Sequence, residues 1–385
     1  MPLPKKGTPE FAELEKRYLA STKEERNQMA KEYGYAARHN FQTCMTQGRD
    51  VLLPRQKKVV IQNDEGKSEP EQTIERKPIV ELPPVNFIEY RGKEIKEEGD
   101  EEVAILHVGD GHADKITSSY NKDVYRTRMG TMFQSAMTIV KLHRKMYPIN
   151  KLLILNTGDN IQGENPHQGS KIGDVSMGAR DQVKKLAAPM WNDIIGSFKQ
   201  NFVEVIFEGF PGNHGHDKLA PETSRYDLLL YDILEAGIGQ NKGIKININE
   251  SWCGIIRIWG WKLFGFHGDG IPCQQGVPFF ALDRKLKAWH MQFGGFNYAF
   301  GGHFHKEHSD EISSRLKYFM VSSLTSDDEW AQKKLGISSN PSQGLYGLHP
   351  REGITWRYSL VVDEKFLPES LEHQLTLPVE KSNHA

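Results

Sequence analysis

Cysteine is scarce in this chain, and its three residues form no recognisable pair. Cys44, Cys253 and Cys273 are widely spaced, and none belongs to a Cys-x-x-Cys motif. This pattern argues against both a disulfide framework and a thiolate zinc site. Because isolated thiols are typical of a reducing compartment, we expect a cytoplasmic protein.

Long apolar runs are also absent. No stretch approaches the roughly 18 consecutive apolar residues that a membrane span needs. Lys5 and Lys6 near the first residue are not followed by the apolar segment of a secretory signal. We therefore expect neither a membrane partner nor export by that route.

Neither sign of charge dominates. The 49 basic and 50 acidic residues give a formal net charge of −1, so polyanion binding would have to come from a local patch or a metal centre. One such patch is the segment 1–58, which contains twelve basic and seven acidic residues.

This basic segment has the spacing of two short helices, Lys23–Gly34 and Ala36–Gly48. The interval from Ala30 to Gly34 and the basic surface resemble a helix-turn-helix DNA-binding element. A helical hairpin that packs on the rest of the protein or supports oligomerisation explains the same pattern equally well.

The remaining chain divides by composition. Residues 59–102 are acidic and contain four interrupting prolines, which is typical of an extended linker, with a short strand expected at Val85–Tyr90. Residues 103–370 have the regular alternation of one main domain, and 371–385 form a tail. The segment after Leu324 includes Trp330, Tyr346 and Trp356. Two roles are open for it: it could close over a bound ligand, or it could add strands to the sheet.

Short apolar runs alternate with helix-like segments in the main domain. The runs with strand length are Val103–Val108, Leu152–Thr157, Val203–Glu208, Leu263–His267 and Tyr298–Gly301. Helical spacing is present over Arg126–Tyr147 and Ala179–Phe198. The alternation predicts a layered α/β fold. A Trp259-Gly260 turn between Cys253–Ile258 and Trp261–Phe266 predicts a hairpin, so part of a sheet should be antiparallel.

Polar residues beside glycine follow the ends of these strands. The loops are Gly109-Asp110-Gly111-His112, Gly158-Asp159-Asn160, Gly212-Asn213-His214, Phe266-His267-Gly268 and Gly302-His303-Phe304-His305. Loops at the carboxyl ends of strands gather at one edge of a layered α/β fold, so these side chains can meet around one ligand. Each motif by itself is weak, because such pairs also occur in ordinary turns; the signal lies in the ordered set.

The residue types in these loops favour a pair of metal ions. Carboxylate, carboxamide and imidazole groups without thiolates suit manganese, iron, zinc or magnesium. Seven candidate ligands are more than one ion would take, but they divide naturally between two ions that share a carboxylate, and Asp159 is the expected bridge. The seven candidates are Asp110, His112, Asp159, Asn213, His267, His303 and His305.

In this order, D-x-H, G-D, G-N-H, a lone H and G-H-x-H, the motifs resemble the calcineurin-like metallophosphoesterase superfamily. The resemblance covers Asp110 to His305 and implies a β-sandwich flanked by helices. It implies two divalent ions, with Mn²⁺ favoured and Mg²⁺, Fe, Zn²⁺ and Ni²⁺ left open. It assigns Asp110, His112, Asp159 and His305 to the first metal, and Asp159, Asn213, His267 and His303 to the second.

The same resemblance implies that His214 is the catalytic histidine. Two cations would convert a bridging water into the attacking hydroxide, and an imidazolium would assist the leaving oxygen. Two departures leave the partner of His214 open: Gly215 and Gln162 stand where many relatives have acids. The candidates for this partner are His216, Asp217 and Asp227.

The sequence that flanks the motifs is similar to that of phage and prophage members of the superfamily, nearest the SbcD-like nucleases and phosphodiesterases. We therefore expect a DNA nuclease, exonuclease or endonuclease, in a bacterial cell or a phage-infected host. Alternatives are a phosphomonoesterase acting on proteins or small molecules, and a DNA-binding or scaffold protein with a vestigial metal site. DNA is the expected partner. SbcD-type nucleases dimerise and use an ATPase; since this chain has no Gly-x-x-x-x-Gly-Lys-Ser/Thr loop, any motor would be a separate chain.

Overall fold

The computed structural model describes residues 9–21, 25, 28, 29, 32, 90, 92–94, 101–164, 172–216, 220–272, 278–327 and 340–363. The chain separates into two compact units, Met1–Ile74 and Glu75–Ala385, and each is described by itself. The division falls within the segment that we expected to be a linker. No helix in the described ranges is both long enough and apolar enough to cross a membrane.

In the first unit, helix α1 (Pro9–Ala20) buries Leu14 and Tyr18, one helical turn apart, on one face. Helix α1 was not among the helices expected from the sequence. Of the two helices expected after it, the described residues include only 25, 28, 29 and 32, all of them helical. The expected helix-turn-helix therefore lies almost entirely outside the described residues, as does the expected strand at Val85–Tyr90 except for its last residue.

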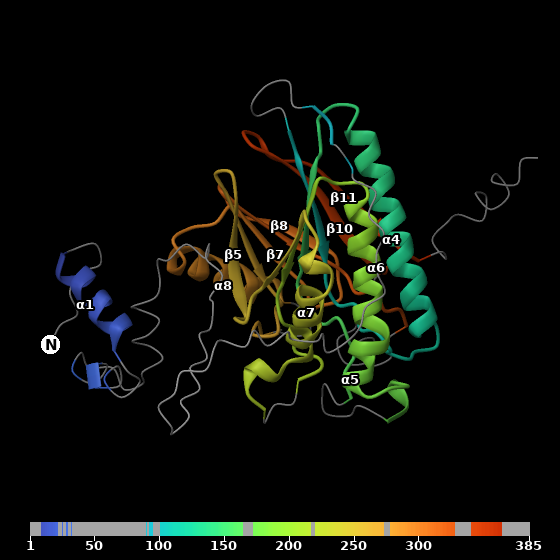
Figure 1. Ribbon diagram of the computed structural model, residues 1–385, viewed down its shortest axis with the longest axis horizontal. Helices are drawn as coiled ribbons and strands as arrows, with labels where there is room; N and C mark the ends of the chain where they lie inside the picture. Colours follow the sequence, from blue (N-terminus) through green and yellow to red (C-terminus); the bar gives the residue numbers. More distant parts are fainter. Residues whose placement is uncertain are drawn as a thin grey trace, which may run out of the picture. The chain divides into compact units, whose positions relative to one another are not determined.

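The second unit is built on two sheets (Figure 1). The first has the order β11-β10-β1-β2-β3-β4, in which β1 to β4 are parallel, β10 is antiparallel to β1, and β11 is antiparallel to β10. Its strands are β1 (Val103–Val108), β2 (Lys151–Asn156), β3 (Glu204–Gly209), β4 (Ile244–Ile248), β10 (Ser342–His349) and β11 (Gly353–Val361). Among the described residues, the segment after Leu324 thus completes this sheet.

The second sheet has the order β5-β6-β7-β9-β8. Strands β6, β7 and β9 are parallel, while β5 and β8 are antiparallel to their neighbours. The strands are β5 (Cys253–Ile258), β6 (Trp261–Phe266), β7 (Tyr298–Gly301), β8 (His308–Ser313) and β9 (Leu316–Met320). The predicted β5–β6 hairpin is confirmed, and Trp259 in its turn has a φ of 51°, the left-handed conformation that such turns require.

Helices cover the outer faces of both sheets. The α-helices of this unit are α4 (Lys122–His143), α5 (Ala179–Gln182), α6 (Ala188–Lys199), α7 (Tyr226–Ala236) and α8 (Phe279–Gln292). A π-helical stretch, η2 (Val183–Ala187), joins α5 to α6, and three short 3₁₀ turns are η1 (Ile172–Asp174), η3 (Glu222–Ser224) and η4 (Ile238–Gln240). Helices α4 and α6 run side by side on one face of the first sheet (Figure 1).

Alternation along β1 explains the layers. Ala104, Leu106 and Val108 pack with the core under α4, α6 and α7, whereas Val103 and Ile105 pack against residues of the second sheet. A third core lies between the second sheet and α8. A strand covered on both faces reads as a continuous apolar run, which is why β1 was visible in the sequence. The predicted α/β class, a layered β-sandwich flanked by helices, is confirmed.

Candidate metal centre

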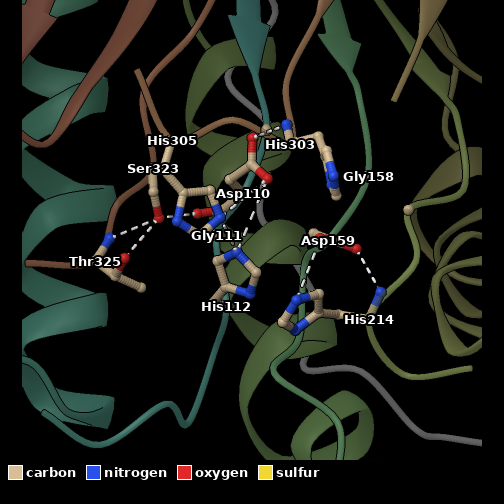
Figure 2. Close-up of polar contacts among 12 residues, drawn as sticks. Asp110, Gly111, His112, Gly158, Asp159, His214, His303, His305, Ser323 and Thr325 are labelled. Atoms are coloured by element: carbon tan, nitrogen blue, oxygen red, sulfur yellow. Dashed lines mark hydrogen bonds and ion pairs between the residues drawn. The ribbon is translucent and has the colours of Figure 1, made fainter. Parts of the chain in front are cut away.

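The loops that follow the strands of both sheets meet at one place. The backbone N–H groups of Asp110 and His112 donate to the carbonyl oxygens of Gly158 (3.0 Å) and Asp159 (2.9 Å), so the loops after β1 and β2 run together. From the second sheet, the N–H of His303 donates to Oδ2 of Asp110 (2.8 Å; Figure 2). The structure therefore brings the predicted residues of distant strands to one common edge.

Asp110, His112 and His305 form the first cluster (Figure 2). The Nε2 atoms of the two histidines are 2.9 Å apart, and they lie 3.8 Å and 3.5 Å from Oδ1 of Asp110. Burial, together with the nearby His214 and His305, holds the pKa of His112 well below its ordinary value. His112 is therefore neutral at pH 7, the form in which imidazole binds a metal.

Asp159, His267 and His303 form the second cluster. Nε2 of His267 lies 3.2 Å from Oδ2 of Asp159 and 3.2 Å from Nδ1 of His303. It is also 2.9 Å from Oδ1 of Asn213, which brings the carboxamide into the group. Nδ1 of His267 donates to the carbonyl of Thr157 (2.7 Å), and this bond directs Nε2 toward the cluster.

The charges of this second cluster are strongly coupled. Burial lowers the pKa of His267, but the Asp159 carboxylate more than offsets it, and the result is a pKa of about 10. Burial likewise opposes the charge on Asp159, yet His267 and His214 hold its pKa well below the ordinary value. The pKa of His303 falls to about 4 through burial and the neighbouring His267. The metal-free second cluster is thus an ion pair with one neutral imidazole beside it.

Asp159 belongs to two groups of close donor atoms. Besides the second cluster, it forms a group with His112 and His214 in which all ligand atoms lie within 4.8 Å of one another. Its Oδ1 accepts the backbone N–H of His214 (2.7 Å), and its Oδ2 faces His267. Since His112 is also a member of the first cluster, this carboxylate lies between the two clusters, where a shared ligand would have to be.

An unsatisfied buried oxygen shows that the site fits a cation. Oδ1 of Asp110 is buried and has no hydrogen-bond donor among the described residues, and Oδ2 of Asp159 has only the ion pairs with His267 and His214. A buried carboxylate oxygen without a partner is costly, and a divalent ion beside Asp110 would remove that cost. The donors are oxygen and nitrogen without sulfur, so the clusters could hold hard or borderline metal ions.

The backbone at the site is unusual. Of the seven predicted ligands, these have a positive φ: Asp110 (54°), His112 (44°), Asp159 (55°), His303 (73°) and His305 (52°). Left-handed non-glycine residues are uncommon, occur more often for Asp and His, and gather at functional sites. This backbone lets the chain turn back after each strand while the side chain still points inward.

His214 lies beside both clusters. Its ring centroid is 4.4 Å from that of His112, and its Nδ1 donates to the backbone carbonyl of Gln162 (3.1 Å). Burial lowers the pKa of His214 to about 4, although Asp159 and the Gln162 carbonyl act in the opposite direction. A main-chain carbonyl therefore orients the ring, and no side-chain motif predicts such a partner.

Three residues were considered as that partner from the sequence. The Asp227 carboxylate accepts the backbone N–H groups of Asp159, Asn160 and Gly212. Nε2 of His216 has no hydrogen-bond partner among the described residues. Asp217 lies outside the described residues.

Several supporting residues were missed. Gln343 on β10 accepts the N–H of Gly109 (2.9 Å) and donates to the carbonyl of Ser322 (2.8 Å). The hydroxyl of Ser323 donates to the carbonyl of Asp110 (2.8 Å; Figure 2). These residues carry no motif, and the loop residues that they hold, Gly109 and Asp110, lie more than 200 positions away along the chain, so no local signal could have identified them.

No family model matches the sequence, and neither does any curated protein. Solved structures that match include a predicted phosphoesterase from Streptococcus pneumoniae (11% identity, 67% of this chain and 98% of that chain, TM-score 0.28). Others are Vps29 complexed with Zn²⁺ from Entamoeba histolytica (13%, 67% and 99%, 0.27) and a 5'-nucleotidase from Candida albicans (12%, 67% and 51%, 0.31). These identities and scores are too low to carry an argument about activity, so the function must rest on the site.

Proposed function

We propose that this chain is a metal-dependent phosphoric ester hydrolase with two divalent ions. Asp110, His112 and His305 would hold the first ion, and Asn213, His267 and His303 would hold the second, with Asp159 as the bridge. One observation carries the proposal: two buried clusters of Asp and His lie side by side, and a third group of close donor atoms, His112, Asp159 and His214, connects them through Asp159.

When bound, two such ions would supply an activated water and neutralise charge on the phosphoryl oxygens. The chain's own contribution is to position the groups around them. The carbonyl of Thr157 directs Nε2 of His267 inward, and Oδ1 of Asp159 holds the backbone of His214. These bonds are made before substrate arrives, so little reorganisation is needed at the reaction.

His214 is the proposed acid for the leaving oxygen. The Gln162 carbonyl holds the Nδ1–H, which leaves Nε2 as the atom that exchanges a proton with substrate. A phosphate placed beside the ring would raise the pKa of His214 from its low value, because a nearby negative charge favours imidazolium. The side chains of His214 and His305 are 11% and 17% exposed, whereas Asp110 and Asp159 are buried, so we place substrate entry on this side.

The substrate that we propose is a phosphodiester of DNA, with Mn²⁺ as the favoured ion. This finer assignment rests on the residues that flank His214 and His267 in their motifs and on the basic segment 1–58. DNA, a second copy of the chain and a separate ATPase remain the proposed partners. The phosphomonoesterase and the vestigial site are outcomes that the following experiment distinguishes.

The test is hydrolysis by the full chain after metal removal and reloading with Mn²⁺. Bis(4-nitrophenyl) phosphate is compared with the monoester, and then end-labelled single- and double-stranded DNA are digested. We expect turnover of the diester and of DNA that chelation abolishes. Preference for the monoester would replace the diesterase by a phosphatase, and two bound ions without turnover of any substrate would support the vestigial site.

A further inference from the structure

Asp227, in the first turn of α7, is a buried carboxylate that touches none of the seven proposed ligand side chains in the described contacts. Its Oδ2 accepts the backbone N–H groups of Asp159 (2.9 Å) and Gly212 (2.8 Å). Its Oδ1 accepts the N–H (3.1 Å) and the Nδ2 (2.9 Å) of Asn160. With 1% exposure, this one side chain satisfies three backbone donors from the loops that follow β2 and β3.

Those two loops approach each other through glycine. A Cβ added to Gly158 would overlap the backbone of Gly212, and a Cβ added to Gly212 would overlap the carboxylate and backbone of Asp159. At such close packing, the direction of the Asp159 side chain depends on where the second loop lies. Asp227 bonds to both sides of this contact and so sets their separation.

A second residue of α7 forms hydrogen bonds at the ends of the same strands. Tyr231, one helical turn after Asp227, places its hydroxyl 2.8 Å from the carbonyl of Phe210 and 2.8 Å from Oδ1 of Asn156. Asn160 donates from Nδ2 to that hydroxyl (3.0 Å) as well as to Asp227. The face of α7 thus holds the ends of β2 and β3 through a connected and fully buried network, which is rigid when all its members are satisfied.

We propose that Asp227 is a positioning residue of the two-metal centre, which fixes the left-handed backbone of Asp159 and thereby the direction of the bridging carboxylate. The inference rests on the proposed metal centre and adds a residue that no ligand motif contains. Partners that orient metal ligands typically contribute 10- to 100-fold to metal affinity. Replacing the carboxylate by an amide would set an NH₂ group against backbone N–H donors and loosen the loop contact.

The experiment compares Mn²⁺ binding to the metal-free full chain for the wild type, Asp227→Asn and a matched control, Glu102→Gln. Glu102 is also a buried carboxylate, but it precedes β1 at the end away from Asp110 and bonds to Trp356 (2.7 Å) and Thr355 (2.5 Å). We expect Asp227→Asn to bind Mn²⁺ about 10- to 100-fold more weakly and to alter the spin coupling between the two ions. Glu102→Gln should keep wild-type affinity and coupling even if it lowers thermal stability.

Wild-type affinity and coupling in Asp227→Asn would overturn the inference while leaving the proposed function intact. Failure of the wild type to bind two ions would overturn the proposed function instead, so the two failures are distinguishable. If Asp227→Asn does not fold, Asp227→Ser keeps a small acceptor at the position, and the same loss of affinity is expected. Equal weakening in Asp227→Ser and Glu102→Gln would also contradict a positioning role.

Discussion

Asp110 and His303 follow strands of different sheets and are 193 residues apart, yet the backbone N–H of His303 donates to Oδ2 of Asp110 at 2.8 Å. This bond occupies one carboxylate oxygen and leaves Oδ1 facing His112 and His305. The arrangement of the first cluster is therefore a property of the assembled sandwich and not of any single loop.

Asp159→Asn tests the shared ligand. An amide presents a neutral oxygen and an NH₂ group, so we expect both metal positions to lose affinity together. Elemental analysis after loading with Mn²⁺ and desalting should give fewer than one ion per chain, against two for the wild type. Asp123→Asn, an exposed change on α4, is the control. A variant that retained two ions would contradict the bridging role.

His214→Ala separates catalysis from metal binding. We expect kcat to fall by about 10²- to 10⁴-fold, the usual contribution of a general acid, while metal content stays near two. His143→Ala, which removes a histidine stacked on Trp356, should leave kcat unchanged. Because His214 also forms a group with His112 and Asp159, parallel loss of metal and activity would reassign it as a ligand.

Metal binding should release protons. In the metal-free protein His267 has a pKa of about 10 and carries a proton at pH 7.5, which a metal must displace. Calorimetry in buffers of different ionisation enthalpy should therefore show roughly one proton released from this group. The same raised pKa stabilises the metal-free fold: its contribution to the free energy of unfolding is fully present below the unfolded pKa of about 6.5 and is lost as pH rises through 10. His267→Asn should release fewer protons, and equal release would argue against this source.

Glu208→Gln tests a buried acid away from the ligands. Burial raises the pKa of Glu208 to about 6, although Asn247 and Asn249 donate to it. The native state binds this proton more tightly than the unfolded chain, so its stabilising effect is present below pH 4.5 and is lost as pH rises through 6. Relative to the wild type, Glu208→Gln should gain up to about 2 kcal/mol between pH 4.5 and pH 7.5. Urea unfolding at both values measures the difference, and no change would contradict the shift.

Gly212→Ala probes the contact between the loops after β2 and β3. Its Cβ would overlap the Asp159 carboxylate, so we expect a clear loss of Mn²⁺ affinity and of thermal stability. Gly130→Ala on α4 meets nothing within 4 Å and should stabilise the helix by about 1 kcal/mol. Unchanged metal affinity in Gly212→Ala would show that the loops tolerate a wider separation.

The parts of the fold that the sequence predicted are those with a local signal. Strands β1 and β7 were predicted with their observed bounds, and β2, β3 and β6 to within two residues at each end, because a strand buried on both faces is a continuous apolar run. The β5–β6 hairpin was visible in its turn. In contrast, β10 is interrupted by Gly344 and Gly347 and pairs with β1 across more than 200 residues, which no local pattern reveals.

The same distinction applies to the candidate site. Six of the seven proposed ligands stand next to glycine after a strand, and His305 follows two residues after His303, so their convergence could be predicted from topology. From the sequence, Asp227 was considered only as a partner of His214. Its role as an acceptor for the backbone N–H groups of Asp159, Asn160 and Gly212 could not be foreseen. Every residue except proline has the same backbone N–H and C=O groups, so the sequence does not show which of them bond to a side chain. The carbonyl of Gln162 was missed for the same reason.

The order in which the chain is synthesised limits when this centre can exist. The first cluster needs His305, and the carbonyl of Asp110 accepts hydrogen bonds from Ser323 and Leu324. A nascent chain that has emerged only as far as β3 holds Asp110, His112 and Asp159 without their later partners. Incorporation of the proposed ions would therefore follow translation of the second sheet, and truncated products should remain metal-poor and inert.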